Sequence, residues 1–170
     1  MRISKFAGLP AHPLFVHLPV VLIPLVAIGA VAMALSARAR ERLGWVVLAL
    51  AIVAGLSTQL AIGSGKALQD SVQKSTALDH HIAIGESIRP LALLLFLVAL
   101  AVMLIDRRAL GRWPFRDQPA RTVPAAAKAG AVALTLLVSV GTCVRLYEIG
   151  DSGAKATWQN THLVAPPDSR

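Results

Sequence analysis

Four long apolar stretches occupy most of this 170-residue chain and strongly restrict its fold. They cover residues 14–35, 43–62, 82–105 and 125–149. A helix of about 20 apolar residues crosses the roughly 30 Å hydrocarbon core of a bilayer, so each stretch is long enough to span it. The stretches are rich in Ala, Leu and Val and do not alternate polar with apolar residues, which favours helices over barrel strands. We therefore predict an all-α, polytopic membrane protein with four transmembrane helices in an up-down bundle.

Composition agrees with a single membrane domain over residues 1–170, in which residues 150–170 form a tail. The chain is 55% hydrophobic and 15% charged, which leaves too little polar surface for a soluble domain of this size. Its net charge of +8 does not indicate nucleic-acid binding, because the basic residues form no patch interleaved with aromatic residues. The lipid bilayer is therefore the first partner that we expect.

The distribution of arginine predicts how the chain is oriented, since short cytoplasmic connections are enriched in Lys and Arg. The second connection and the tail carry nearly balanced charges. We therefore expect the first and third connections to be cytoplasmic and both termini to be extracytoplasmic. The arginines of those two connections are Arg38, Arg40, Arg42, Arg107, Arg108, Arg112, Arg116 and Arg121.

All five histidines fall at one face of this topology. Odd-numbered spans begin, and even-numbered spans end, on the same side of the membrane. His12 and His17 open the first span, His80 and His81 open the third, and His162 follows the fourth. Because imidazole is the commonest metal ligand and also binds haem iron, we expect a site near the outer face.

The spacing of the histidines ranks them as ligands. His12 and His17 are five residues apart, so they point about 140° away from each other on a straight helix. His17 lies deeper, so it is expected to face the interior. His81, Gly85 and Arg89 fall along one stripe, where the glycine leaves space for a flat macrocycle or for a packed helix. We predict His17 and His81, and then His12, as ligands of haem iron or another metal; the alternative is that backbone carbonyls satisfy these rings.

Polar residues within the spans form a second group of candidates. Charges in a membrane are rarely unpaired. The third and fourth spans each carry an i, i+3 pair of opposite charge, Glu86 with Arg89 and Arg145 with Glu148, and the cross pairs Glu86–Arg145 and Arg89–Glu148 are possible at the same depth. We expect a salt-bridge network of these four residues to clamp the two spans; the alternative is that the arginines bind haem propionates or a quinone headgroup. Gln59 is expected to hydrogen-bond across the bundle.

Glycines suggest where two of the helices end. The sequence Gly63-Ser64-Gly65 is expected to end the second helix, and Gly150 the fourth. Trp158 would then return to the interface as a lid.

Three motifs in this order resemble a family of bacterial four-span membrane proteins, Domain of Unknown Function family 2231. They are His-Pro-x-x-x-His-x-Pro beginning at His12, the histidine His81 at the third span, and Ile-Gly-Asp-Ser-Gly-Ala-Lys-Ala-Thr-Trp ending at Trp158. Members often carry His-Ser-Gly-Ala after the last span, where this chain has Asp151 as the first residue.

The resemblance implies a location in the bacterial cytoplasmic membrane and a similarity to four-helix b-type cytochromes, in which histidines from neighbouring helices hold haem. The matching positions here are His12, His17 and His81, and the implied cofactor is haem b. At most one haem is expected, because no histidine lies at the cytoplasmic face.

Two functions compete at this point. One is a haem- or metal-binding electron-transfer subunit that works with a quinone, an extracytoplasmic electron carrier or other membrane subunits. The other is a non-catalytic structural or accessory subunit without a cofactor; a small permease is a weaker third reading, because the midplane lacks broken helices or repeats. No catalytic residues are expected, since no arrangement typical of a hydrolase or transferase is present.

Overall fold

The computed structural model describes residues 5–6, 9–105 and 124–158. The described chain is mostly helical, and it contains two two-residue strands, β1 (Lys5–Phe6) and β2 (Leu9–Pro10), which pair antiparallel. Four segments are long and apolar enough to cross a membrane, which confirms the predicted all-α membrane fold. The helices are α1 (Ala11–Leu35), α2 (Ala37–Leu68), α3 (Thr76–Gly85), α4 (Ile88–Ile105) and α5 (Ala125–Trp158), with a short 3-10 turn η1 (Gln69–Ser71) after α2.

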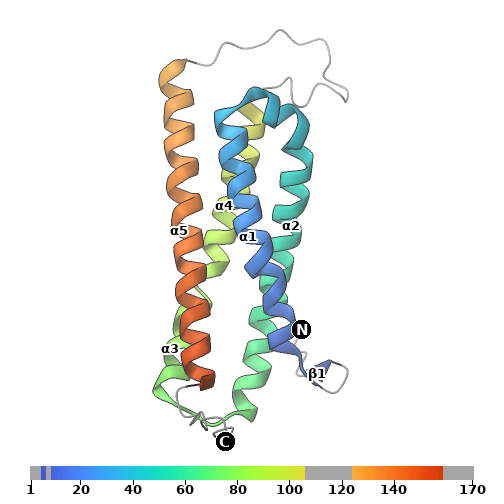
Figure 1. Ribbon diagram of the computed structural model, residues 1–170, viewed down its shortest axis with the longest axis vertical. Helices are drawn as coiled ribbons and strands as arrows, with labels where there is room; N and C mark the ends of the chain where they lie inside the picture. The colour runs from blue at the N-terminus through green and yellow to red at the C-terminus, as the bar shows by residue number, and fades with distance from the viewer. Residues whose placement is uncertain (1–4, 7–8, 106–123, 159–170) are drawn as a thin grey trace, which may run out of the picture.

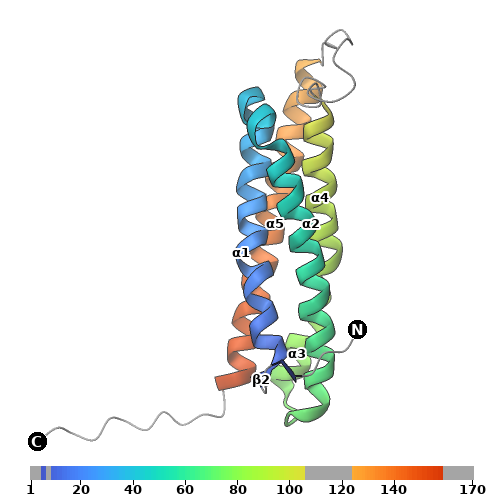
Figure 2. The same ribbon diagram turned by 90° about the vertical axis from the view of Figure 1, so that its right-hand side faces the viewer.

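The long helices lie side by side and alternate in direction, as Figures 1 and 2 show from two sides. Helix α1 packs against α2, α4 and α5, while α2 packs on α4 and α3 packs on α5. The start of α1, the end of α2, all of α3 and the end of α5 therefore meet at one end of the bundle. We call this the histidine end, because it carries His12, His17, His80 and His81, as the topology predicted.

The core is a stripe of small and aliphatic side chains, mostly from the first three spans, with Val138 from α5. On α1 the buried positions include Ile23, Ala27 and Ala30, which follow the helical period. Small residues bring α1 and α2 close together: a Cβ built on Gly29 would lie 2.6 Å from Cγ2 of Val47. Close approach of this kind maximises van der Waals contact, which drives helix association in a bilayer.

Helix α5 packs into the bundle through hydroxyl groups. Thr135, Ser139 and Thr142 are buried along one face of the helix. The threonine hydroxyls donate to carbonyls one turn back in α5, at 2.6 and 2.7 Å, so they are satisfied without a partner helix. Ser139 lies 3.5 Å from the carbonyl oxygen of Ala27 on α1. These short side chains let α5 lie directly against α1 and α4.

The third span is broken into two helices, which the sequence analysis treated as one. Pro90 has no amide hydrogen and its ring conflicts with the carbonyl four residues earlier, that of Glu86. The chain instead makes a tighter turn, in which the amide of Arg89 donates to the Glu86 carbonyl at 3.2 Å. The Ser87 hydroxyl and amide both donate to the carbonyl of Ile84, at 2.5 and 3.1 Å. As a result α3 is a separate short helix at the histidine end.

Helices α2 and α5 both continue beyond their expected ends. The predicted stop at Gly63 is wrong, because α2 runs on to Leu68, and the predicted stop at Gly150 is wrong, because α5 runs on to Trp158. Glycine weakens a helix but does not end it where packing supports the helical form. Both extensions lie at the histidine end, where they pack against the histidine-bearing helices.

Candidate functional site

His12 is held in the first turn of α1 by the extended end of α2. Its Nδ1 lies 2.9 Å from the carbonyl oxygen of Ala61 and 3.5 Å from Oγ of Ser64. A carbonyl oxygen only accepts hydrogen bonds, so Nδ1 carries the hydrogen and donates it. In the neutral ring the lone pair is then on Nε2, which is the nitrogen left to bind a ligand.

His81 on α3 is held in the same way by the extended end of α5. Its Nδ1 lies 2.9 Å from Oγ of Ser152. The Ser152 hydroxyl donates its own hydrogen to the carbonyl of Ile149, at 2.8 Å, so it accepts from His81. His81 therefore has the same tautomer as His12, with the lone pair on Nε2.

The two imidazoles lie next to each other. Their ring centroids are 6.3 Å apart and their planes are inclined at 67°. A single metal ion bound at about 2 Å by one nitrogen of each ring holds the centroids roughly 6 Å apart when the two nitrogens lie on opposite sides of the ion, and roughly 5 Å apart at a tetrahedral angle. The observed separation matches the first arrangement.

Corresponding residues build the two halves of this site. Ser64 donates to Ala61 at 2.9 Å, just as Ser152 donates to the carbonyl three residues before it. A glycine follows each serine and lies against the ring: a Cβ built on Gly65 would be 3.1 Å from Cε1 of His12, and one built on Gly153 would be 3.0 Å from Cε1 of His81. We call this arrangement the histidine pair: His12 with Ser64 and Gly65, and His81 with Ser152 and Gly153.

A repeat in the sequence accompanies the structural repeat. Residues 62–67 read Ile-Gly-Ser-Gly-Lys-Ala, and residues 149–156 read Ile-Gly-Asp-Ser-Gly-Ala-Lys-Ala. The first hairpin (α1 and α2) and the second (α3, α4 and α5) thus each carry one histidine of the pair in their first helix and this segment near the end of their last helix. We interpreted both segments as helix ends and so missed Ser64 and Ser152 as site residues. Comparing the two segments would have identified them.

The expectation that His17 faces the interior is wrong. His17 is exposed on α1, and its Nδ1 donates to the carbonyl of Pro13 in its own helix, at 2.6 Å. The rotation of α1 directs His12, rather than His17, toward His81. The histidines predicted as ligands thus separate into one pair, His12 and His81, and one outward ring.

The predicted ion pairs between the third and fourth spans are not found among the described residues. Arg145 pairs within α5, with Glu148, at 2.9 Å, rather than with Glu86. Glu86 pairs with Lys66 of α2 at 2.5 Å, and so joins the two hairpins. Arg89 is exposed at the start of α4. All of these side chains lie at the histidine end.

Three further expectations concern single residues. Gln59 is exposed on α2, so the prediction that it bonds across the bundle is wrong. Trp158 is the last residue of α5 and is 63% exposed, so it does not cover the site as a lid. His162 lies outside the described residues.

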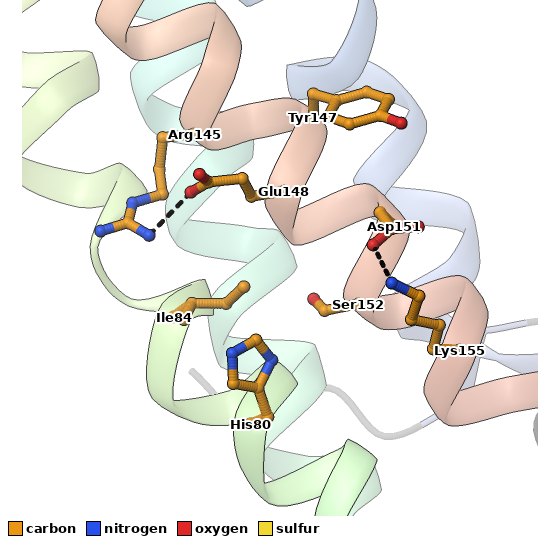
Figure 3. Close-up of a pocket in the computed structure, with 8 residues that line it drawn as sticks. All are labelled: His80, Ile84, Arg145, Tyr147, Glu148, Asp151, Ser152 and Lys155. Carbon is orange, nitrogen blue, oxygen red and sulfur yellow. Dashed lines mark hydrogen bonds and ion pairs between the residues drawn. The ribbon is translucent and has the colours of Figure 1, made fainter.

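A surface groove lies between α3 and α5, beside the histidine pair. Figure 3 shows its lining: His80 and Ile84 come from α3 and the remaining side chains from α5. Its volume is about 340 Å³. Ser152 belongs to both places, since it lines this groove and accepts the hydrogen bond of His81. The α5 residues are Arg145, Tyr147, Glu148, Asp151, Ser152 and Lys155.

The histidine pair offers few side chains that could bind a metal ion. Within residues 5–6, 9–105 and 124–158, no group of three or more His, Cys, Asp or Glu side chains is placed to hold a metal ion. Structural zinc takes four protein ligands and catalytic zinc takes three, so two imidazoles do not complete such a site. Two imidazoles would be enough protein ligands for a haem iron, because a macrocycle would supply the other nitrogens.

Comparison with known proteins places the chain in a family. Residues 8–166 match the family model described as "Predicted membrane protein (DUF2231)". No curated protein and no solved structure matches the chain. The match covers nearly the whole sequence, so this protein belongs to the DUF2231 family of predicted membrane proteins.

Proposed function

We propose that this membrane protein binds one haem b between His12 and His81 and serves as an electron-transfer subunit. The single observation that carries the proposal is the histidine pair, in which both rings have hydrogen-bonded Nδ1 atoms and centroids 6.3 Å apart. A haem iron with two histidine ligands exchanges one electron and has no open position for a substrate.

The surrounding residues support this ligand role. Metal-binding histidines usually donate their second ring N–H to a carbonyl or another oxygen, which fixes the ring and makes it a better ligand. The carbonyl of Ala61 and the hydroxyl of Ser152 accept in this way. Gly65 and Gly153 let each ring lie against a helix backbone. The two rings come from different hairpins, so a ligand between them would also join the hairpins.

The position of the pair limits how electrons could travel. Both rings lie at the histidine end, and the α1–α2 connection, which carries Arg38 and Arg42, lies at the opposite end. By the positive-inside rule, the histidine end is extracytoplasmic in this proposal. A single centre at one face cannot carry electrons across the bilayer, so donor and acceptor would meet the protein on that side, or partner subunits would complete the path.

An absorption spectrum of the purified protein tests the proposal. We expect a Soret band after expression in cells supplied with haem, and we expect His12→Ala and His81→Ala each to abolish it, because each removes one iron ligand. His17→Ala is the matched control: it removes an exposed histidine from the same helix and should leave the band unchanged.

Two results would overturn the proposal. A featureless spectrum with no metal by elemental analysis would favour a structural subunit, in which the histidine pair only fastens the hairpins. Copper or zinc in place of iron, lost in the same two variants, would instead identify a different metal centre.

A further inference from the structure

The groove between α3 and α5 has the features of a binding site for a small, neutral, lipid-soluble molecule. We propose that it binds the headgroup of a hydroquinone from the membrane. The use of such a molecule as an electron donor rests on the proposed function, but its binding in the groove does not.

The groove is directly connected to the histidine pair. Ser152 lines the groove and accepts the hydrogen bond from Nδ1 of His81. A headgroup in the groove would therefore lie one side chain away from a proposed iron ligand. The volume of about 340 Å³ is at the lower end of the range for small-molecule sites, which suits a single ring rather than a large ligand.

The hydrogen bonds of Ser152 favour the binding of a hydroquinone over that of the corresponding quinone. A serine hydroxyl has one hydrogen and two lone pairs. The hydrogen goes to the carbonyl of Ile149 and one lone pair accepts from His81, so one lone pair is left. A ligand that bonds there must donate a hydrogen. The hydroxyl of a hydroquinone does so, whereas the carbonyl of a quinone does not.

The charged side chains of the groove favour a neutral ligand. The two cations of the groove are both neutralised by carboxylates of the same helix: Arg145 lies 2.9 Å from Glu148, and Lys155 lies 2.7 Å from Asp151. Figure 3 shows these ion pairs on either side of Ser152. An anionic lipid headgroup would have to displace a carboxylate. A neutral headgroup fits without breaking either pair.

An exposed stripe on α5 gives a lipid-soluble ligand access to the groove. A stripe of exposed side chains runs along α5 toward the groove at helical spacing: Leu137, Val140, Val144 and Tyr147, with exposed fractions between 51% and 75%. In a bilayer this stripe faces the acyl chains, so the apolar tail of a hydroquinone could lie along it while the headgroup enters the groove.

Photolabelling of the full-length protein in nanodiscs tests the proposal. The probe is an azido-substituted benzoquinone with a decyl tail, kept reduced with ascorbate. We expect labelled peptides from α3 and from the end of α5. Decyl-hydroquinone should compete roughly tenfold better than its dimethyl ether, which cannot donate a hydrogen bond.

A pair of variants locates the site. Ile84→Trp fills the groove and should abolish specific labelling, whereas Leu60→Trp adds the same bulk to an exposed position of α2 and should not. If Ile84→Trp does not fold, the comparison of the two competitors in the wild-type protein still decides. Labelling that is spread over all lipid-facing helices, or equal competition by the dimethyl ether, would overturn the proposal. Displacement of the probe by phosphatidylglycerol would assign the groove to an anionic lipid instead.

The haem proposal can fail separately. The His12→Ala protein has an intact groove, so it should be labelled like the wild type whether or not the wild type shows a Soret band. Loss of the band without loss of labelling would therefore concern the histidine pair alone.

Discussion

A serine and the glycine after it lie beside the ring in each half of the histidine pair. Ser152 accepts the hydrogen bond of His81 at 2.9 Å, whereas His12 donates to the carbonyl of Ala61 at 2.9 Å and lies 3.5 Å from Oγ of Ser64. The following glycine provides room, because any side chain on Gly65 or Gly153 would meet the ring of the histidine it touches. The glycine thus lets an imidazole pack against a helix in both halves, and the serine before it accepts the ring's hydrogen bond in the His81 half.

Gly153→Ala tests the need for room. Alanine normally stabilises a helix by about 1 kcal/mol relative to glycine, but here its Cβ would lie 3.0 Å from His81 and displace the ring. We expect loss of bound haem and no gain in thermal stability in detergent. Gly141→Ala is the control, since a Cβ at this exposed position of α5 meets nothing within 4 Å. Normal haem binding by Gly153→Ala would contradict this account of the glycine.

The residue scale is also where sequence-based prediction failed for a physical reason. The presence of a histidine cluster at one end follows from chain order alone. Which of His12 and His17 faces inward depends on the rotation of α1, and that helix is apolar on all sides. Buried Ile23 and exposed Ile28 are chemically equal, because core and lipid are equally apolar. The pattern therefore contained no signal for the rotation.

At the scale of elements, α5 shows how a helix can pack without large side chains. Its buried face carries hydroxyl groups, and Ser139 is only 4% exposed beside the carbonyl of Ala27. This face allows close contact with α1 but leaves no space for a longer side chain.

Ser139→Leu should therefore separate α5 from α1. We expect a destabilisation of about 1–3 kcal/mol from overpacking, measured as a lower midpoint of thermal unfolding in detergent. Leu137→Ala changes a side chain of the same helix that is 72% exposed, and it should leave the midpoint nearly unchanged. Equal midpoints for Ser139→Leu and the wild type would show that α5 does not depend on this contact.

Helix lengths were predictable only where the apolar stretches set them. The apolar patterns located all four spans, but Gly63 and Gly150 were interpreted as helix ends although both helices pass through them. Tertiary contacts with the histidine-bearing helices explain both continuations, and sequence alone does not show these contacts. The break before Pro90, by contrast, had a local cause that the sequence contained.

At the scale of the whole molecule, the orientation in the membrane remains a prediction. The proposed direction puts the α1–α2 connection, with Arg38 and Arg42 exposed, in the cytoplasm. Alkaline phosphatase fused after the last residue should be active, and green fluorescent protein inserted at Ser36 should be fluorescent. The reverse pattern would place the histidine end in the cytoplasm and with it the proposed haem site.

The two hairpins repeat the same features but belong to one chain. If two identical copies of a single hairpin assembled around a bound molecule, every substitution would change both histidine-bearing halves together. When both hairpins are in one chain, the two halves can differ in sequence. Here Lys66 pairs with Glu86 across the hairpins, while the corresponding Lys155 pairs with Asp151 inside α5. The surroundings of His81 can therefore change independently of those of His12, and the groove beside His81 can adapt to a ligand that His12 does not contact.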